Sequence, residues 1–336
     1  MRLVSFGPRG SERPGALVNG SVLPLPPVMA SLGLDPAGTI RSVLPFLGPL
    51  CEAIGAAAAR GDQLIPLDQT RLGPPIADPP NLFACGANYF SHLSEPGLDM
   101  PGTPILPVMF LKPRSALSGP ADPVIRPTET TQLDYEAELA IVIGKAGRRI
   151  HASQAASHIA GYMIANDVSA RDLMEGESRK LSSPVLLQIM RAKGWDTFLP
   201  TGPWLVTADE AGSYENIRIQ TWVNGEPRQD AYAKEMTNNP YQIIEWLSAT
   251  TTLQPGDIIT TGTPAGVAMG MAAPRWLVPG DTIRIQMTGL GTMTTPVRQE
   301  HRDQALRVAR EYGTGSQPLA DRNGRMRRLQ RRGEGT

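Results

Sequence analysis

The stretch DYEAELAIVI, residues 134–143, carries two carboxylates two positions apart in a segment of aliphatic and β-branched residues. This composition predicts a β-strand. Because successive side chains of a strand point to opposite faces, Glu136 and Glu138 are expected on one face, with Cα atoms roughly 6.6 Å apart. Two acids this close raise each other's pKa unless a cation lies between them, and a hard divalent ion meets that need. An ordinary solvated strand face with scattered acids explains these ten residues equally well.

A third carboxylate ends the next hydrophobic segment, IAGYMIANDVSARDL, residues 159–173. The apolar run stops at Asn166 and Asp167, where the chain is expected to turn. Asp167 is therefore well placed to complete a metal site begun on a neighbouring strand. Three carboxylates with no cluster of Cys or His predict Mg²⁺ or Mn²⁺ rather than zinc.

The composition favours a chain of many short strands and turns. Its 336 residues are 41% hydrophobic with few aromatics, and they include 34 glycines and 32 prolines. Lys plus Arg equals Asp plus Glu at 32 each, so the overall charge gives no attraction to nucleic acid or to a membrane surface. Cys51 and Cys85 cannot form a disulfide framework and fit a reducing compartment. No apolar run reaches the about 18 residues that a membrane span needs, so a cytoplasmic protein with no membrane partner is predicted.

Three segments follow from the changes in composition along the chain. Residues 1–74 are predicted to form a small N-terminal α/β module, with a hairpin at Asn19–Gly20 and a helix over residues 40–60. The proline-rich run GPPIADPP, residues 73–80, connects it to a catalytic domain over residues 75–300. Residues 301–336 are charged and poor in apolar residues, which predicts a disordered tail.

Two turn signals mark the later part of the catalytic segment. Asn224–Gly225 lies between two alternating stretches and predicts a β-hairpin. Pro240 is expected to open a helix that runs to about Thr250.

Four further side chains are candidates for chemistry. His92 and Glu95 are three residues apart, as neighbours on a helical turn are, so Glu95 can orient His92 as a general base; a surface hydrogen bond is the alternative. Lys112 follows an apolar strand and either attracts an anionic substrate or is a solvated lysine. The loop TTGTPAGVAMG, residues 260–270, lacks the ending of a phosphate-binding loop. Its amides and the Thr263 hydroxyl can approach a substrate carboxylate, and a plain tight turn is as compatible with the sequence.

Taken in order, several motifs resemble the fumarylacetoacetate hydrolase family over roughly residues 81–297. They are NYFSHLSE, FLKPRSALSGP, DYEAELAIVIG, ANDVSARDL, AKGWDTFLPTGPWLVT, TTGTPAGVA and PGDTIRIQMTGLG. The resemblance implies a mixed, β-rich α+β fold in which rolled sheets, or a β-sandwich roll, enclose a metal and an oxo acid. It also implies a homodimer.

The resemblance assigns roles to individual residues. It implies that Mg²⁺ or Mn²⁺ is held by Glu136, Glu138 and Asp167, and that His92 with Glu95 activates water. It further implies that Lys193 is an active-site lysine, that Thr263 contacts a substrate carboxylate and that Arg171 lies near the site. With Lys112, Arg171 and Thr263 are the predicted substrate-binding residues.

The function expected from these roles is hydrolysis of a carbon–carbon bond in a 2,4-dioxo acid similar to an acylpyruvate or fumarylpyruvate. The alternatives on the same fold are decarboxylation of an oxaloacetate-like acid, isomerisation of a hydroxymuconate-type acid and dehydration of a sugar acid. A nucleic-acid role for the six arginines of residues 322–332 is not expected, because that segment has no folded reading surface.

Overall fold

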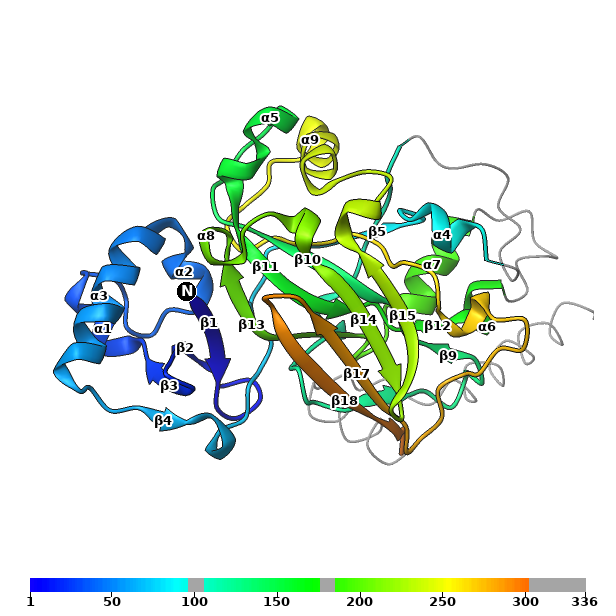
Figure 1. The fold of residues 1–336 in the computed structure, drawn as a ribbon, viewed down its shortest axis with the longest axis horizontal. Helices are drawn as coiled ribbons and strands as arrows, with labels where there is room; N and C mark the ends of the chain where they lie inside the picture. The colour runs from blue at the N-terminus through cyan, green and yellow to red at the C-terminus, as the bar shows by residue number, and fades with distance from the viewer. Residues whose placement is uncertain (96–105, 176–184, 302–336) are drawn as a thin grey trace, which may run out of the picture. The chain divides into compact units, whose positions relative to one another are not determined.

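The computed structural model describes residues 1–95, 106–175 and 185–301. Residues Met1–Arg298 form one compact unit of short strands and helices (Figure 1). The predicted β-rich α+β class is confirmed by its large sheets. The predicted tail lies outside the described residues, except for its first residue, His301. The predicted boundary near residue 74 falls within this compact unit and stays a prediction.

The largest sheet has 11 strands, and its central members carry the candidate site. Along its main path the strands are β4 (Ile65–Pro66), β3 (Ser21–Pro24), β2 (Arg13–Val18), β1 (Arg2–Phe6), β13 (Leu199–Thr207), β11 (Ile159–Asn166), β10 (Ala137–Ile143), β16 (Ile258–Thr260), β5 (Leu82–Gly86) and β6 (Val108–Leu111), with β7 (Leu117–Ser118) pairing with β13. Most neighbours are antiparallel, whereas β16 with β5 and β13 with β7 are parallel.

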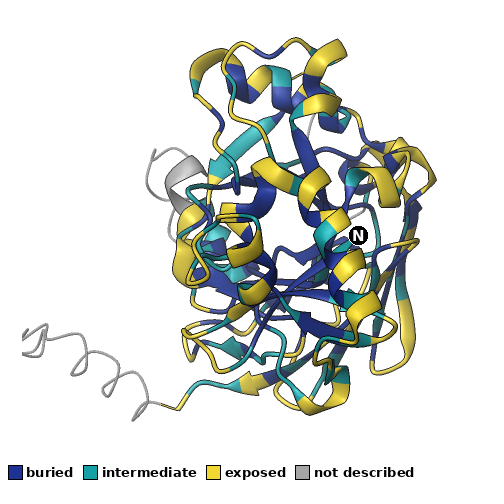
Figure 2. Ribbon diagram, turned by 90° about the vertical axis from the view of Figure 1, so that its left-hand side faces the viewer, coloured by how far each residue is buried: buried dark blue, intermediate teal, exposed yellow. Residues whose placement is uncertain are grey.

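Two smaller sheets and the helices complete the unit. The second sheet runs through β15 (Glu226–Tyr232), β14 (Arg218–Val223), β17 (Thr282–Met287), β18 (Gly291–Gln299) and β8 (Val124–Arg126), and β12 (Ser169–Ala170) pairs with β9 (Leu133–Asp134). The α-helices of the described residues are α1 (Pro26–Ser31), α2 (Ile40–Val43), α3 (Leu47–Arg60), α4 (Phe90–Leu93), α5 (Ala152–Ala155), α6 (Arg171–Glu175), α7 (Val185–Lys193), α8 (Ala208–Ala211) and α9 (Pro240–Thr250). Strands near the middle are buried while many helical residues face solvent (Figure 2).

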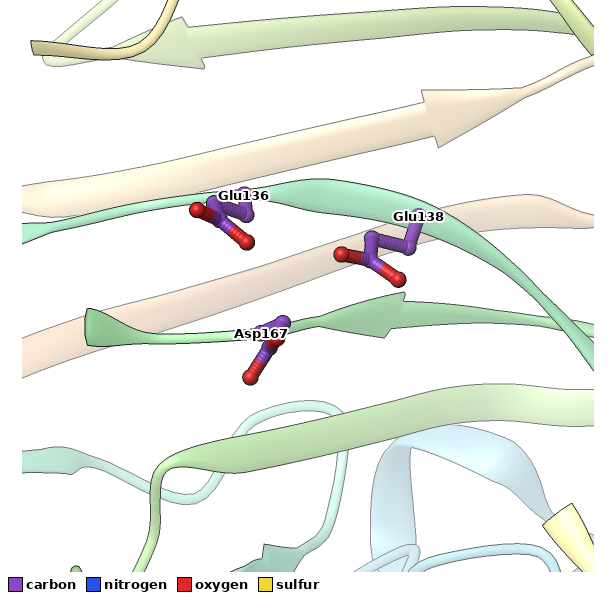
Figure 3. Close-up of side chains that lie close together, drawn as sticks. All are labelled: Glu136, Glu138 and Asp167. Atoms are coloured by element: carbon purple, nitrogen blue, oxygen red, sulfur yellow. The ribbon is translucent and has the colours of Figure 1, made fainter. Parts of the chain in front are cut away.

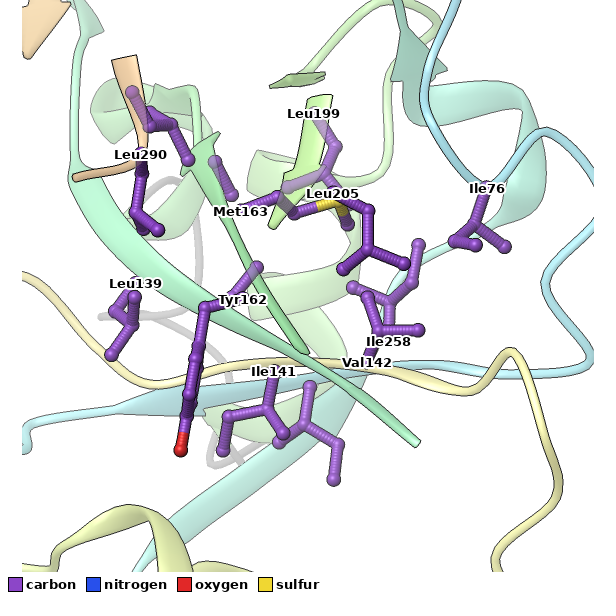
Figure 4. Packing of buried hydrophobic residues seen from close by; sticks show 14 of the residues in the cluster. Ile76, Leu139, Ile141, Val142, Tyr162, Met163, Leu199, Leu205, Ile258 and Leu290 are labelled. Carbon is purple, nitrogen blue, oxygen red and sulfur yellow. The ribbon is translucent and has the colours of Figure 1, made fainter. Parts of the chain in front are cut away.

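Strand β10 lies at the centre because its residues are apolar on both faces. All seven of its residues are buried, and it pairs with β11 on one side and β16 on the other. Leu139, Ile141 and Val142 belong to one hydrophobic cluster with Tyr162 and Met163 of β11 (Figure 4). An ionisable side chain on such a strand is therefore forced into the interior, as Glu138 is.

The predicted strand over residues 134–143 is broken. Asp134 ends β9 and β10 begins only at Ala137. Between them, the Glu136 N–H donates to the Asn166 side-chain oxygen at 2.9 Å, and the Asp167 N–H donates to the Glu136 carbonyl oxygen at 2.9 Å. The hydrogen bond from Glu136 to the Asn166 side chain thus replaces part of the regular backbone pairing between the strands. The bond from Asp167 to the Glu136 carbonyl oxygen brings these two residues side by side.

The N-terminal segment shows the predicted hairpin and a helix that differs from the prediction. Asn19 and Gly20 both have positive φ, 49° and 77°, between β2 and β3. Residues 40–60 are divided into α2, a 3₁₀ turn and α3, which ends at the left-handed Gly61.

The stretch Ile40–Arg60 is long and apolar enough to cross a membrane by length and composition, although Arg41 and Glu52 interrupt its apolar run. One such stretch is a weak indication, and Ile40, Leu50 and Ile54 are buried in the hydrophobic core. The absence of a membrane partner stays a prediction.

Both later turn signals are confirmed. Asn224 and Gly225 have φ of 52° and 82° and join β14 to β15. Helix α9 starts at Pro240, and the Asn239 side chain caps it by accepting the N–H groups of residues 241 and 242.

Replacing Ile141 by alanine is expected to lower the free energy of unfolding by about 2–5 kcal/mol, because a fully buried side chain in the central strand leaves a cavity. Urea denaturation measures this loss. Val278→Ala is the control, since Val278 is 49% exposed and should change stability by less than about 0.5 kcal/mol. Equal effects of the two variants would contradict the central position of β10.

Candidate metal centre and active site

Three buried carboxylates meet beside the start of β10. Each of Glu136, Glu138 and Asp167 offers one oxygen within 4.8 Å of the others'. Figure 3 shows Glu136 and Glu138 directed to the side where Asp167 follows the end of β11. The alternative of scattered, solvated acids is wrong, because all three side chains are buried.

The two glutamates have opposite electrostatic environments. Burial raises the pKa of Glu138 well above its usual value, and the charges of Asp167 and Glu136 raise it further. Burial alone would also raise the pKa of Glu136, but the charges of Lys193 and Arg171 lower it below its usual range. Glu138 is therefore the acid that most lacks a positive charge.

Three basic side chains surround the other two acids. Lys193 Nζ donates to Glu136 Oε2 at 2.6 Å and to Asp167 Oδ2 at 2.7 Å. Lys112 Nζ donates to the remaining oxygen of Asp167 and to the Phe198 carbonyl oxygen. These bonds leave lone pairs free, because a carboxylate has about four acceptor sites.

Arg171 reaches the site through a fourth acid. Its Nη2 lies 2.7 Å from Glu136 Oε1, and its Nε donates to Asp134 Oδ2 at 2.9 Å. Asp134 is fully buried and also accepts the N–H groups of Ala268 and Met269. Asp134 thus holds the guanidinium in place against Glu136.

These residues fit a hard divalent cation. The donors are carboxylate oxygens only, they converge in a buried site, and Glu138 has too little positive charge around it. Glu138 Oε2 accepts a hydrogen bond from the Gly262 N–H at 2.7 Å. A cation of charge +2 would favour the ionised form of this acid, whose buried charge is otherwise costly.

The predicted pair of His92 and Glu95 is present on and just after α4. His92 Nδ1 lies 2.5 Å from Glu95 Oε2, and Glu95 Oε1 accepts the Gly266 N–H at 2.7 Å. His92 is buried, and a positive charge on its ring lowers the pKa of Glu136. The imidazole is therefore within electrostatic reach of the acids, with Nε2 as the nitrogen that can accept a proton.

Thr263 lies in the loop of residues 260–270, and its hydroxyl forms two hydrogen bonds within the protein. The hydroxyl donates to the Ala137 carbonyl oxygen at 3.0 Å and accepts from Gln229 Nε2 at 2.7 Å. A contact of this hydroxyl with a substrate carboxylate stays a prediction, and it would have to replace the bond to Ala137.

The structure brings the predicted residues together, and it adds two that the sequence analysis missed. Lys112 contacts Asp167 rather than solvent, so the solvated reading of this lysine is wrong. Asp134 was missed as a site residue, although its alternation with Glu136 and Glu138 was a signal. Asn166 was treated only as the end of an apolar run, and its bond to the Glu136 N–H had no sequence signal.

Glu138→Gln is expected to stabilise the metal-free protein at pH 8. With a folded pKa raised above the unfolded value, the folded protein holds a proton that the unfolded chain releases, so stability falls as pH rises through that window. Glutamine removes this ionisation, and the advantage should vanish near pH 4, where both states of the wild type are protonated. Thermal denaturation in EDTA at the two pH values measures it. A variant less stable than the wild type at pH 8 would contradict the assignment.

Comparison with known proteins adds a family and several relatives. Residues 81–298 match the family model described as fumarylacetoacetate (FAA) hydrolase C-terminal. A 2,4-didehydro-3-deoxy-L-rhamnonate hydrolase of Sphingomonas sp. (strain SKA58) is 35% identical over 303 residues, which cover 89% of this chain and 96% of that protein. The mitochondrial oxaloacetate tautomerase FAHD2A of Bos taurus is 38% identical over 234 residues, covering 70% and 71%.

A solved structure adds a bound metal. The maleylpyruvate hydrolase from Sphingobium sp. SYK-6, in complex with manganese(II) ion and pyruvate, superimposes with a TM-score of 0.72 at 32% identity. The match covers 90% of this chain and 100% of that one.

Proposed function

The chain belongs to the fumarylacetoacetate hydrolase family, and we propose that it is a divalent-metal-dependent hydrolase that cleaves a carbon–carbon bond in a 2,4-dioxo acid. The observation that carries this proposal is a buried triad of acids in electrostatic reach of a histidine that a glutamate orients. The hydrolase relative that matches 89% of the chain supports it.

Glu136, Glu138 and Asp167 are the residues that would hold Mg²⁺ or Mn²⁺. Such an ion supplies Lewis acidity toward adjacent substrate oxygens. The manganese in a related maleylpyruvate hydrolase supports a metal here, and Mg²⁺ and Mn²⁺ are both compatible with the oxygen donors.

His92 would accept the proton of the attacking water at Nε2. Glu95 holds Nδ1 and so fixes the orientation of the ring. The Gly266 N–H holds Glu95 in turn, which keeps the pair rigid. As the carbon–carbon bond breaks, the same imidazolium can return the proton to the carbon that leaves.

Lys193 would stabilise negative charge on the substrate. Its ammonium has three N–H donors, of which two bind Glu136 and Asp167. The third can bind a substrate oxygen, a contact worth about 3 kcal/mol where charge develops. Lys112 and Arg171, proposed as substrate-binding residues, also neutralise the acids that they contact.

Tautomerisation of an oxaloacetate-like acid is the second candidate, favoured by the 38% identical tautomerase. A divalent ion held by the three acids, together with Lys193, would stabilise an enolate without any attack by water. His92 would then move a proton between oxygen and carbon.

Turnover in H₂¹⁸O separates the two reactions. With acetylpyruvate as the simplest 2,4-dioxo acid, the hydrolase should release pyruvate and place one ¹⁸O in the carboxylate of the released acetate. Conversion of enol-oxaloacetate to its keto form, with no cleavage of any dioxo acid tested, would overturn the hydrolase proposal and support the tautomerase.

The homodimer, the absence of a nucleic-acid partner and the cytoplasmic location remain predictions. Strand β6 supports a dimer, since within the part of the chain that the structure describes it ends the large sheet and its Leu111 is 49% exposed. A particle in solution of twice the 36.1 kDa chain mass would agree with it.

A further inference from the structure

Ala137 lies between the two glutamates, and on one side its backbone groups have no strand of the described residues to pair with. Strand β10 pairs with β16 only from Ala140 to Val142, because β16 ends at Thr260. The N–H and C=O of Ala137 are buried, so they need other partners.

The side chain of Gln229 supplies one of those partners and Thr263 the other. Gln229 Oε1 accepts the Ala137 N–H at 3.1 Å, and the Thr263 hydroxyl donates to the Ala137 carbonyl oxygen at 3.0 Å. Gln229 Nε2 donates to the Thr263 hydroxyl at 2.7 Å. The three residues therefore form a closed ring of hydrogen bonds around the backbone that separates Glu136 from Glu138.

Chemistry fixes the orientation of the Gln229 amide. Its oxygen faces the Ala137 N–H, which can only donate, and its nitrogen faces the Pro264 carbonyl oxygen at 2.9 Å, which can only accept. The Thr221 hydroxyl donates to Oε1 at 3.0 Å and anchors the amide to β14. Both donors and both acceptor positions of this 2% exposed side chain are thus used.

The ring also fixes the second glutamate. Gly262, one residue before Thr263, donates its N–H to Glu138 Oε2. A shift of the loop would therefore move the Glu138 carboxylate, and a shift of Ala137 would change the spacing of the two glutamates.

We propose that Gln229 is a positioning residue of the metal centre. From its place in the second sheet, it sets the distance between Glu136 and Glu138. The inference rests on the proposed function in one respect, namely that the acid triad binds a divalent ion. None of the four hydrogen bonds of the Gln229 amide goes to a carboxylate of the triad, so Gln229 acts through Ala137 and Thr263.

Gln229→Met tests the proposal, because methionine has a similar length and none of the four hydrogen bonds. The binding of Mn²⁺ alone, followed by electron paramagnetic resonance of the free ion, should weaken by about 10-fold. This is the lower end of the loss seen when a direct partner of a metal ligand is removed, because Gln229 acts through Ala137 and Thr263. Activity should rise toward the wild-type kcat when Mn²⁺ is increased. Unchanged Mn²⁺ affinity in the folded variant overturns the proposal.

Ser248→Ala is the matched control for general destabilisation. The Ser248 hydroxyl accepts the buried Ile150 N–H at 2.9 Å, so its loss also leaves a buried backbone N–H without a partner, near α9 rather than β10. Its melting temperature should fall while Mn²⁺ affinity stays at the wild-type value. An equal loss of affinity in both variants overturns the proposal.

Thr221→Val gives a second test if Gln229→Met does not fold. It removes only the hydrogen bond from Thr221 to Gln229, and Mn²⁺ affinity should fall by about fivefold, the effect of one neutral hydrogen bond. An unchanged affinity there overturns the positioning role. If the wild-type protein binds no Mn²⁺, the proposed metal site is wrong. If the wild type binds Mn²⁺ and the variant binds it equally well, only the positioning role of Gln229 is wrong.

Discussion

Glu136→Gln is expected to lower kcat/KM by about a thousandfold or more, because one charged ligand of the divalent ion is lost. The amide keeps the size of the side chain and one oxygen for Lys193 or Arg171, which limits the damage to the fold. Steady-state kinetics at fixed Mn²⁺, with circular dichroism to verify folding, measures the effect.

Chelation provides the control for this variant. Wild-type protein treated exhaustively with EDTA should be as inactive as Glu136→Gln, and added Mn²⁺ should restore only the wild type. Full activity of the wild type after chelation would show that the three acids do not hold a metal ion that the reaction needs.

His92→Gln is expected to reduce kcat by about 10²–10⁴-fold, the usual contribution of a general base. Glutamine can still bond Glu95 but cannot take a proton from water. Because His92 is not among the three acids of the proposed metal site, Mn²⁺ affinity should change little. The combination of lost kcat and retained metal affinity separates this residue from the acids.

His158→Gln is the matched control. His158 Nδ1 contacts the Lys145 carbonyl oxygen, and the ring is not buried, so kcat should be unaffected. If His92→Gln keeps the wild-type kcat in hydrolysis, another group must activate the water, and the role proposed for the His92–Glu95 pair is wrong.

Local signals in the sequence were sufficient for several elements of the fold. Asn224–Gly225 and Pro240 each act through the backbone of one or two residues, by allowing positive φ or by opening a helix, so their effects do not depend on distant partners. The same holds for Gly61 at the end of α3. The break before Ala137 was not predictable, because it depends on Asn166, 30 residues away along the chain.

Glu136 and Glu138 were predictable because period-2 spacing places them on one face, and Asp167 because it ends the next apolar run. Their basic partners were harder to place: Lys112 is 55 residues from Asp167 in sequence, and no local pattern fixes such a distance. Gln229 is 92 residues from Ala137, in another sheet, and glutamine carries no charge pattern to reveal it. Contacts between sheets therefore had to come from the structure.

The pairing of β1 with β13 has a practical consequence for work on this protein. The family match begins at residue 81, yet Arg2 and Leu3 pair with Val206 and Leu205 and cover that side of β13. A truncated chain beginning at residue 75 would expose the part of β13 around Leu205 and Val206 as an open, apolar sheet edge able to recruit further copies. Recombinant production of the matched region alone should therefore give aggregates, and full-length protein is the form to purify.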